Sequence, residues 1–253
     1  MIKFFRKIRQ KLLTENKFSK YLIYAIGEIV LVVIGILIAL GINNLNQNRI
    51  AENEEVAILK AMKTDFLETQ NRTKATIKNQ TTVVEFCYKL QITMNEQKDI
   101  DSIGEYIYRG AISYWRVEPV NGTYDGLIGS GKTDIIKNQK LKSLLAEFSA
   151  EIKYGFEDED FCLDLTSSLV EKSSNYAAYL EPERDRKRNG LNKPITEEER
   201  NSAIIRHLKN DSFLGVLVTK SDLEKNRLEY QKNILKFVEN IIAQIESELV
   251  KKE

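Results

Sequence analysis

Histidine is almost missing from this chain, and its scarcity argues against several kinds of active site. His207 is the only histidine among 253 residues, so histidine-based zinc sites and Ser-His-Asp triads have almost no material. It lies in the helical pattern AIIRHLKN, and we interpret it as a structural residue. We therefore predict no enzymatic activity and no catalytic, cofactor-binding or metal-binding residue.

Proline is also rare, with three in the whole chain, whereas 30% of the residues are charged. This composition suits long helices better than a turn-rich β fold. No convincing alternation of apolar and polar residues, the pattern of a half-buried strand, occurs along the sequence. We therefore predict an all-α fold.

Basic and acidic residues are distributed unevenly. Residues 1–20 contain seven Lys or Arg and one acid, Glu15, whereas residues 43–253 contain 31 basic and 35 acidic side chains. A mildly acidic body argues against nucleic acid as a partner. A strongly basic N-terminal segment favours an anionic membrane surface.

A single long apolar run follows this basic segment. Residues 21–42 read YLIYAIGEIVLVVIGILIALGI and include fourteen Leu, Ile or Val side chains. As a helix they span roughly 33 Å, which exceeds the ~30 Å hydrocarbon core of a bilayer. At about 0.3–0.6 kcal/mol each, these side chains outweigh the cost of one carboxyl group, Glu28. The run is predicted to be a transmembrane helix.

The charges on either side of the run predict its orientation. Seven basic residues precede it, and only Arg49 and Lys60 occur in the twenty positions that follow. The positive-inside rule then places residues 1–20 in the cytoplasm and residues 43–253 on the other side. A cleaved signal peptide is the rival interpretation, because Ala39-Leu40-Gly41 resembles a cleavage site. The run is longer than the usual 7–15 residues of a signal sequence, which favours an uncleaved anchor.

The basic segment itself has the pattern of an amphipathic helix. One half of its helical wheel is apolar, and the other half carries Lys3, Arg6, Lys7 and Lys11. Such a helix would lie at the membrane surface with its basic side on anionic lipid. A solvated tail that only fixes topology is the alternative.

Glu28 is the one charged residue inside the run, and it has both a functional and a structural interpretation. Intramembrane carboxyl groups often mark proton or partner sites. The alternatives are a protonated side chain, one that reaches the cytoplasmic interface, or one that pairs across a homo-oligomer. Gly35 and Ala39 form a small-xxx-small pair that would let two helices approach.

The remaining sequence reads as a set of long helices. No Gly or Pro occurs between Gly41 and Gly104, which predicts that the membrane helix continues as a stalk over residues 43–94. The bundle is then expected over residues 95–253. A helix is expected from Asp101 or Ser102 to Trp115, and another helical pattern resumes after Thr133 and reaches about Glu181.

The last third of the chain contains the clearest break. Residues 182–195 are charged and bounded by two prolines, so a loop is expected there. A helix is predicted from Thr196, and the final helix carries an apolar stripe from Ile234 to Leu249 at three- and four-residue steps. Stripes of this kind must be buried against one another, which predicts an antiparallel bundle.

The segment Gly126–Thr133 reads GLIGSGKT and fits the P-loop pattern. A P-loop needs a buried strand before the loop, where Lys132 would reach phosphate and Thr133 would bind Mg²⁺. Residues 116–125 contain proline, glycine and several polar positions, and they do not predict such a strand. A helix ending near Ile128, a turn and a new helix near Thr133 explain the same letters. A strand over residues 116–125 would reopen the nucleotide interpretation.

Two further groups of residues have alternative interpretations. Residues 157–160 read EDED, but four consecutive helical residues point in different directions, so we expect a solvated surface rather than a cation site. Cys87 and Cys162 lie in a body placed outside the cytoplasm, where a disulfide is permitted. Both fall within apolar helical stretches, where a buried free thiol is equally ordinary.

Three stretches resemble one uncharacterised family of small bacterial single-pass membrane proteins, a domain of unknown function. They are FFRKIRQKLLTENKFSKYLIYAIGEIVLVVIGILIALGINN, YDGLIGSGKTDIIKNQKL and the ending IESEL. The resemblance implies one span in the inner (cytoplasmic) membrane and an α-helical periplasmic domain, and it brings no activity. Leu45 and Gly41 depart from it, since the family tends to have Trp and a polar residue there.

The sequence as a whole favours an anchored, extracytoplasmic helical module for interaction or sensing. Its expected partners are anionic lipid, a second copy of the chain or an envelope protein. One alternative is an anchored P-loop enzyme that uses Lys132 and Thr133. The other is a structural stalk that holds a partner complex near the envelope.

Overall fold

A computed structural model describes Gln10, residues 18–154 and residues 159–252 of the chain. The amphipathic helix predicted within residues 1–20, with Lys3, Arg6, Lys7 and Lys11, lies outside these described residues apart from its last positions. Every regular element in the described ranges is a helix, and none is a strand. The prediction of an all-α fold is therefore confirmed.

The longest element is α2 (Phe18–Glu96), which runs for 79 residues without a break. It continues past the apolar run because no Pro or Gly follows Gly41 within it. The helix ends where Gln97 and Asp99 adopt positive φ angles of 55° and 52°. Two compact units divide the chain, Met1–Ala57 and Ile58–Glu253, and α2 contributes residues to both.

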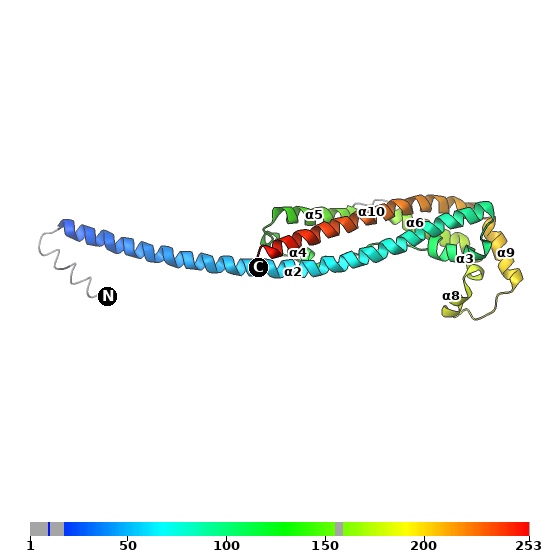
Figure 1. The fold of residues 1–253 in the computed structure, drawn as a ribbon, viewed down its shortest axis with the longest axis horizontal. Helices are drawn as coiled ribbons and strands as arrows, with labels where there is room; N and C mark the ends of the chain where they lie inside the picture. Colours follow the sequence, from blue (N-terminus) through cyan, green and yellow to red (C-terminus); the bar gives the residue numbers. More distant parts are fainter. Residues whose placement is uncertain (1–9, 11–17, 155–158, 253) are drawn as a thin grey trace. The chain divides into compact units, whose positions relative to one another are not determined.

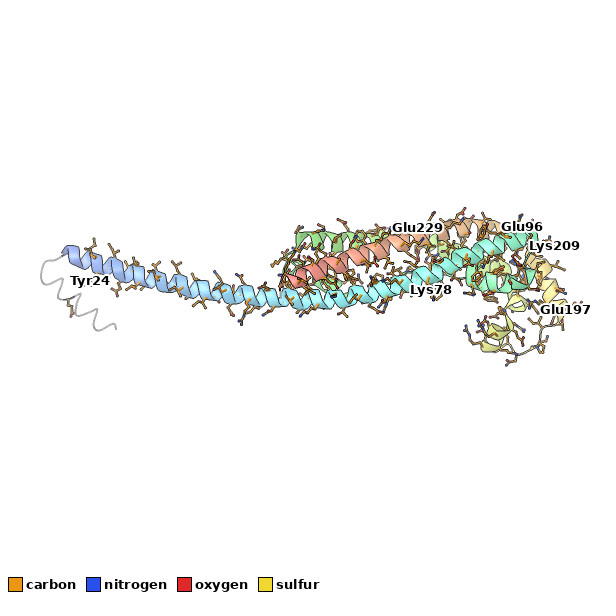
Figure 2. The ribbon with its side chains drawn as sticks, viewed as in Figure 1. Tyr24, Lys78, Glu96, Glu197, Lys209 and Glu229 are labelled. Atoms are coloured by element: carbon orange, nitrogen blue, oxygen red, sulfur yellow. The ribbon has the colours of Figure 1, made fainter. Side chains whose placement is uncertain are left out.

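In the second unit, α2 and α10 (Asp211–Val250) are antiparallel neighbours (Figure 1). Lys63 lies 2.8 Å from Glu246, and Gln70 donates a 3.2 Å hydrogen bond to Glu239. Residue numbers therefore rise along one helix as they fall along the other. Figure 2 shows Glu96 and Lys209 at the same end of this pair. The antiparallel packing expected from the apolar stripes is present.

The sequence from Thr133 to Glu181 is divided more finely than predicted. It forms η3 (Thr133–Ile135), α5 (Gln139–Tyr154), α6 (Glu159–Ser173) and α7 (Ala177–Leu180). Both α5 and α6 pack on α10. Two consecutive helices, α5 and α6, therefore pack along α10.

The predicted helix to Trp115 is wrong at its end. The chain instead forms η1 (Ile100–Ser102), α3 (Ile103–Tyr106) and the π-helical turn η2 (Ile107–Ala111). An irregular stretch then leads to α4 (Gly122–Gly129).

The charged segment 182–195 is not wholly a loop, because it contains α8 (Glu183–Arg188). The helix expected from Thr196 is confirmed as α9 (Glu197–Leu208). Thr196 and Glu199 form a capping box at its start, in which each side chain bonds the other residue's backbone N–H.

The apolar core of the second unit consists of two clusters. One cluster is built around Val83, Leu90, Ile107 and Leu217. The other is built around Leu59, Phe66, Phe148 and Ile241. Both α2 and α10 contribute to each cluster. Between the two clusters, the buried residues of both helices are mainly polar.

Candidate functional site

Polar residues separate the two apolar clusters. Along α2, every third or fourth residue from Leu59 to Met94 is buried, and the middle of this stripe is polar: Thr69, Thr73, Thr76 and Gln80. The matching stripe of α10 carries Lys220, Glu224, Arg227 and Gln231, with exposed fractions of 0–3%. These eight residues, with Glu159 of α6, are called the polar layer below.

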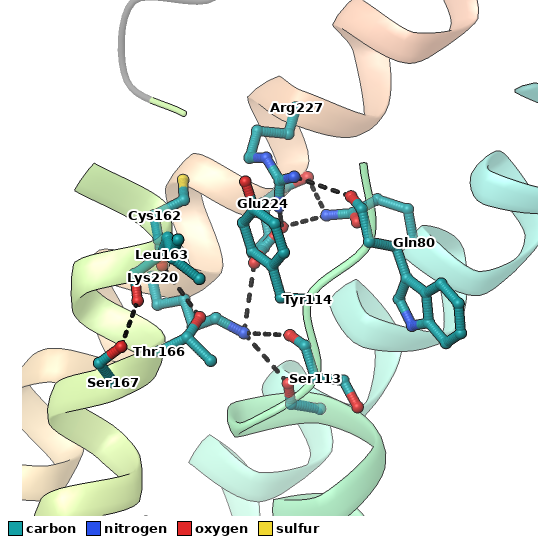
Figure 3. Close-up of polar contacts among 12 residues, drawn as sticks. Gln80, Ser113, Tyr114, Cys162, Leu163, Thr166, Ser167, Lys220, Glu224 and Arg227 are labelled. Carbon is teal, nitrogen blue, oxygen red and sulfur yellow. Dashed lines mark hydrogen bonds and ion pairs between the residues drawn. The ribbon is translucent and has the colours of Figure 1, made fainter. Parts of the chain in front are cut away.

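Lys220 is the first buried charge of the polar layer. Its ammonium group donates to the carbonyl oxygens of Gly110 (3.2 Å) and Ser113 (2.8 Å) and lies 3.2 Å from a carboxylate oxygen of Glu224. An ammonium has three N–H groups, so these three acceptors match its donors. Gln80 of α2 donates to the other Glu224 oxygen, as Figure 3 shows.

Arg227 links three segments of the chain. Its Nε and one terminal nitrogen bind both oxygens of Glu159, at 3.1 and 2.8 Å. The other terminal nitrogen lies 2.7 Å from Glu224, and the Trp115 carbonyl accepts a further bond at 2.8 Å. The guanidinium also lies 4.2 Å from the ring centre of Tyr114. Bidentate pairing and stacking of this kind are available to Arg and not to Lys.

The position of these cations follows from an interrupted helix. Between η2 and α4, residues 113–121 have no regular structure, and the carbonyl groups of residues 113–120 have no intrahelical donors. Lys220 binds carbonyls at the end of η2, where a helix carries partial negative charge. At the start of α4, Asp65 accepts from the backbone N–H of Thr123 at 2.9 Å. Each helix end at the break therefore faces a charge of the favourable sign.

α2 and α10 also fix the irregular stretch itself. The Thr69 hydroxyl bonds both the N–H and the carbonyl of Val120, at 2.8 and 3.0 Å. Gln231 donates a 3.2 Å bond to the Trp115 carbonyl that Arg227 also binds. The polar layer thus holds a non-helical segment against α2 and α10.

The expectation of a solvated acidic surface over residues 157–160 is wrong for Glu159. Its side chain is 20% exposed, and its carboxylate accepts from Arg227 and from the Tyr114 hydroxyl. Burial and this hydrogen bond raise the pKa of Tyr114. Glu157 and Asp158 lie outside the described residues.

Cys87 and Cys162 are both free and fully buried, so the structure contains the free-thiol alternative rather than the disulfide. Burial raises the pKa of Cys87 to about 11 and that of Cys162 to about 12. Thiols with such pKa values are poor nucleophiles near neutral pH.

His207 is fully buried in the last turn of α9, against the start of α10. Its ring packs edge-on against Phe213 and Tyr176, with centroids 4.8 and 5.7 Å away, and Nδ1 lies 3.2 Å from the Tyr176 hydroxyl. Burial lowers the pKa of His207 to about 4. These are the surroundings of a neutral core residue.

The P-loop pattern lies on a helix and a turn. Residues 116–121 have no regular structure, and α4 occupies Gly122–Gly129. Gly131 has a φ of 68°, and the Ser130 hydroxyl bonds the Gly126 carbonyl at 2.8 Å. The strand that a P-loop requires is not formed in this part of the chain. Glu28, the other residue singled out earlier, lies on the exposed apolar stretch of α2.

Sequence reasoning missed the charged members of the polar layer. Their signal is present, because the stripe that starts at Ile234 can be extended backwards by three- and four-residue steps. The steps reach Gln231, Arg227, Glu224 and Lys220. Polar residues at predicted core positions are the pattern that identifies a buried network.

In the part of the chain that the structure describes, the fold is all-α, and one helix near the N-terminus, α2, is long and apolar enough to cross a membrane. The chain matches a family of unknown function (DUF6090) over residues 28–174, more than half of its length, and it belongs to that family. No curated protein and no solved structure matches it. The family match includes Gln80 and Glu159, whereas α10 with Lys220 and Arg227 follows it.

Proposed function

We propose that the protein is a membrane-anchored helical module for interaction or sensing, with residues 1–20 in the cytoplasm and the body on the other side. One observation carries the anchoring. The large apolar side chains from Leu22 to Ile42 are 46–69% exposed, and no residue in the most apolar part of α2 is buried. Exposed apolar surface of this extent favours lipid over water.

The orientation rests on charge. The apolar stretch is preceded by seven basic residues and followed by a neutral or acidic sequence, which the positive-inside rule associates with a cytoplasmic N-terminus. In this arrangement the basic segment lies beside anionic lipid. The body faces envelope components or a second copy of the chain.

A binding role for the body is supported by the state of its buried groups. The cations of the polar layer are paired with carboxylates and carbonyls, and the two thiols have raised pKa values. Such groups fix helices in place and do not provide an activated nucleophile. A rigid body on a continuous helix suits the presentation of a binding surface.

A structural stalk is the second candidate. It is favoured by the continuity of α2 through residues 43–57, where most side chains are exposed and the helix has no break. Deleting fourteen residues from this stretch shortens the helix by about 21 Å and keeps its rotational phase close to the original. A spacer role predicts loss of partner assembly in this variant, whereas ligand binding by the body is retained.

Membrane extraction tests the anchoring. The wild-type chain is expected to remain in the membrane pellet after alkaline carbonate treatment. Arginine at both Val33 and Ile34 costs about 2.5–3.5 kcal/mol per residue at the centre of a span and is expected to release the protein. Arginine at Val218, which is 46% exposed on α10, is the matched control and leaves the protein in the pellet. Release of the wild-type chain by carbonate would contradict the proposal.

A further inference from the structure

A hollow on the body lies beside the irregular stretch that the polar layer fixes. Its volume is about 700 Å³, which is within the range of roughly 300–1,000 Å³ typical of small-molecule sites. Its lining comes from α2, α6 and the irregular stretch. The lining residues used below come from three segments: Arg72, Ala75, Thr76 and Asn79 of α2, Trp115, Arg116 and Glu118 of the irregular stretch, and Asp160 and Leu163 of α6.

Trp115 is the only tryptophan of the chain, and it lies in this hollow with 45% of its surface exposed. Its neighbour Tyr114 also lines the hollow, and the Tyr114 ring lies against the buried Arg227 guanidinium. The Trp115 carbonyl is held by Arg227 and Gln231, which are 1% and 3% exposed. The backbone that carries the exposed ring is therefore fixed from inside, as a binding platform requires.

Opposite charges balance around the hollow. Arg72 and Arg116 supply two positive charges, of which Arg72 is paired at 2.9 Å with Glu68 outside the lining, and Glu118 and Asp160 supply two negative charges. A phosphate or other strongly charged ligand would meet groups of both signs and gain little net attraction. The balance favours a neutral ligand that both donates and accepts hydrogen bonds.

The remaining lining groups specify that ligand further. Asn79 and Arg116 offer planar donors, Glu118 and Asp160 offer paired acceptors, and Thr76 offers a hydroxyl. Leu163 and Ala75 add small apolar contacts beside the Trp115 ring. Neighbouring hydroxyl groups, an acetamide and a flat apolar ring face occur together on N-acetylated sugars.

We propose that this hollow binds a short oligosaccharide of N-acetylated hexoses, with one sugar stacked on Trp115 and its polar groups bonded to Asn79, Arg116 and Asp160. This inference rests on the proposed function only for the side of the membrane on which the body would encounter such a ligand. It names the class of ligand that the body senses or holds.

The test uses the full chain in micelles of a detergent without sugar headgroups and the probe N,N′,N″-triacetylchitotriose. Because Trp115 is the only tryptophan, its fluorescence reports directly on the hollow. We expect a saturable blue shift with a midpoint near 1 mM, on the order of the affinity of a small neutral ligand, and matching heat in calorimetry. Absence of saturable binding up to about 10 mM would overturn the proposal.

Variants then locate the site by calorimetry. Trp115→Ala and Asp160→Ala are each expected to weaken binding at least tenfold, which corresponds to about 1.4 kcal/mol. Trp115→Tyr keeps an aromatic platform and is expected to bind within about threefold of wild type. Tyr88→Ala removes another exposed ring, 58% exposed and outside this lining, and is expected to change nothing. Equal binding by Trp115→Ala and wild type would contradict the site.

The anchoring is read separately. Carbonate extraction does not depend on sugar binding, so a chain that stays in the pellet but fails to bind the trisaccharide refutes this inference alone. A chain that binds the trisaccharide but is released by carbonate would refute the proposed membrane anchor and would not affect the proposed sugar site.

Discussion

Lys220 and Glu224 lie one turn apart on α10, with 3.2 Å between the ammonium and the carboxylate and no exposed surface on either side chain. Such a pair has lost its hydration, and its attraction is offset by the cost of burying two charges. Its main effect is therefore conditional, because removing one charge leaves the other buried with fewer partners. Gln80, Arg227 and the carbonyls of Gly110 and Ser113 complete the same network.

A double-mutant cycle on this pair tests its coupling. Lys220→Met leaves Glu224 buried with less compensation and is expected to lower the free energy of unfolding by about 3–5 kcal/mol. Adding Glu224→Gln is expected to cost less than the sum of the two single changes, as urea unfolding would show.

The control for this cycle is on the same helix. Lys225 and Asp222 form a 2.9 Å pair, and their side chains are 54% and 71% exposed. The cycle of Lys225→Met and Asp222→Asn is expected to give a coupling below about 0.5 kcal/mol. Similar coupling in the two cycles would contradict the burial argument.

Two glycines allow a matched test of close packing. A Cβ at Gly104 would lie 1.6 Å from the Leu180 carbonyl oxygen, whereas a Cβ at Gly215 would meet nothing within 4 Å. Gly104→Ala is expected to destabilise the protein by at least about 2 kcal/mol, because backbone must move. Gly215→Ala lies within α10 and is expected to stabilise it by about 0.5–1 kcal/mol. Thermal melts compare the two, and equal melting temperatures would show that α3 and α7 do not approach this closely.

His207 makes stability depend on pH. Its pKa is lowered to about 4 in the folded chain by burial, whereas an unfolded histidine titrates near 6.5. The unfolded state therefore binds this proton first, and stability falls as the pH drops from about 6.5 to about 4, by roughly 3 kcal/mol. The measurement is urea unfolding at pH 7.5, 5.5 and 4.5. His207→Phe removes the titrating group, and its stability is expected to fall less over the same range; identical slopes would refute the assignment.

The two buried thiols are expected to react slowly with alkylating reagents. With pKa values of about 11 and 12, Cys87 and Cys162 carry little thiolate at pH 8. Iodoacetamide is expected to label the folded protein more than about 100-fold more slowly than the denatured protein. Denaturation without a reductant is expected to expose two labelled thiols per chain. Labelling of none would show that the disulfide exists.

The sequence predicts elements well where one physical rule dominates. The absence of Gly and Pro after Gly41 predicts a helix through residue 94, and α2 ends at Glu96. Thr196 followed by three glutamates predicts the start of α9, because acidic side chains favour the positive end of a helix.

The rest depends on contacts between distant residues. The helix predicted to Trp115 ends at Ala111, because Lys220, Arg227 and Gln231 supply donors to carbonyls that a helix would otherwise satisfy itself. Those donors come from more than a hundred positions away, beyond the reach of any local pattern. The same holds for Glu159, whose partner Arg227 is 68 residues further on.

We expect the body to lie across the membrane from the N-terminus, and two reporter fusions test this topology. A reporter active only outside the cytoplasm is fused after Glu253, and a reporter active only in the cytoplasm is fused at the same residue in a second chain. We expect the first reporter to be active and the second to be silent, since seven basic residues precede the apolar run. The reverse result would place the body in the cytoplasm and contradict the proposed orientation.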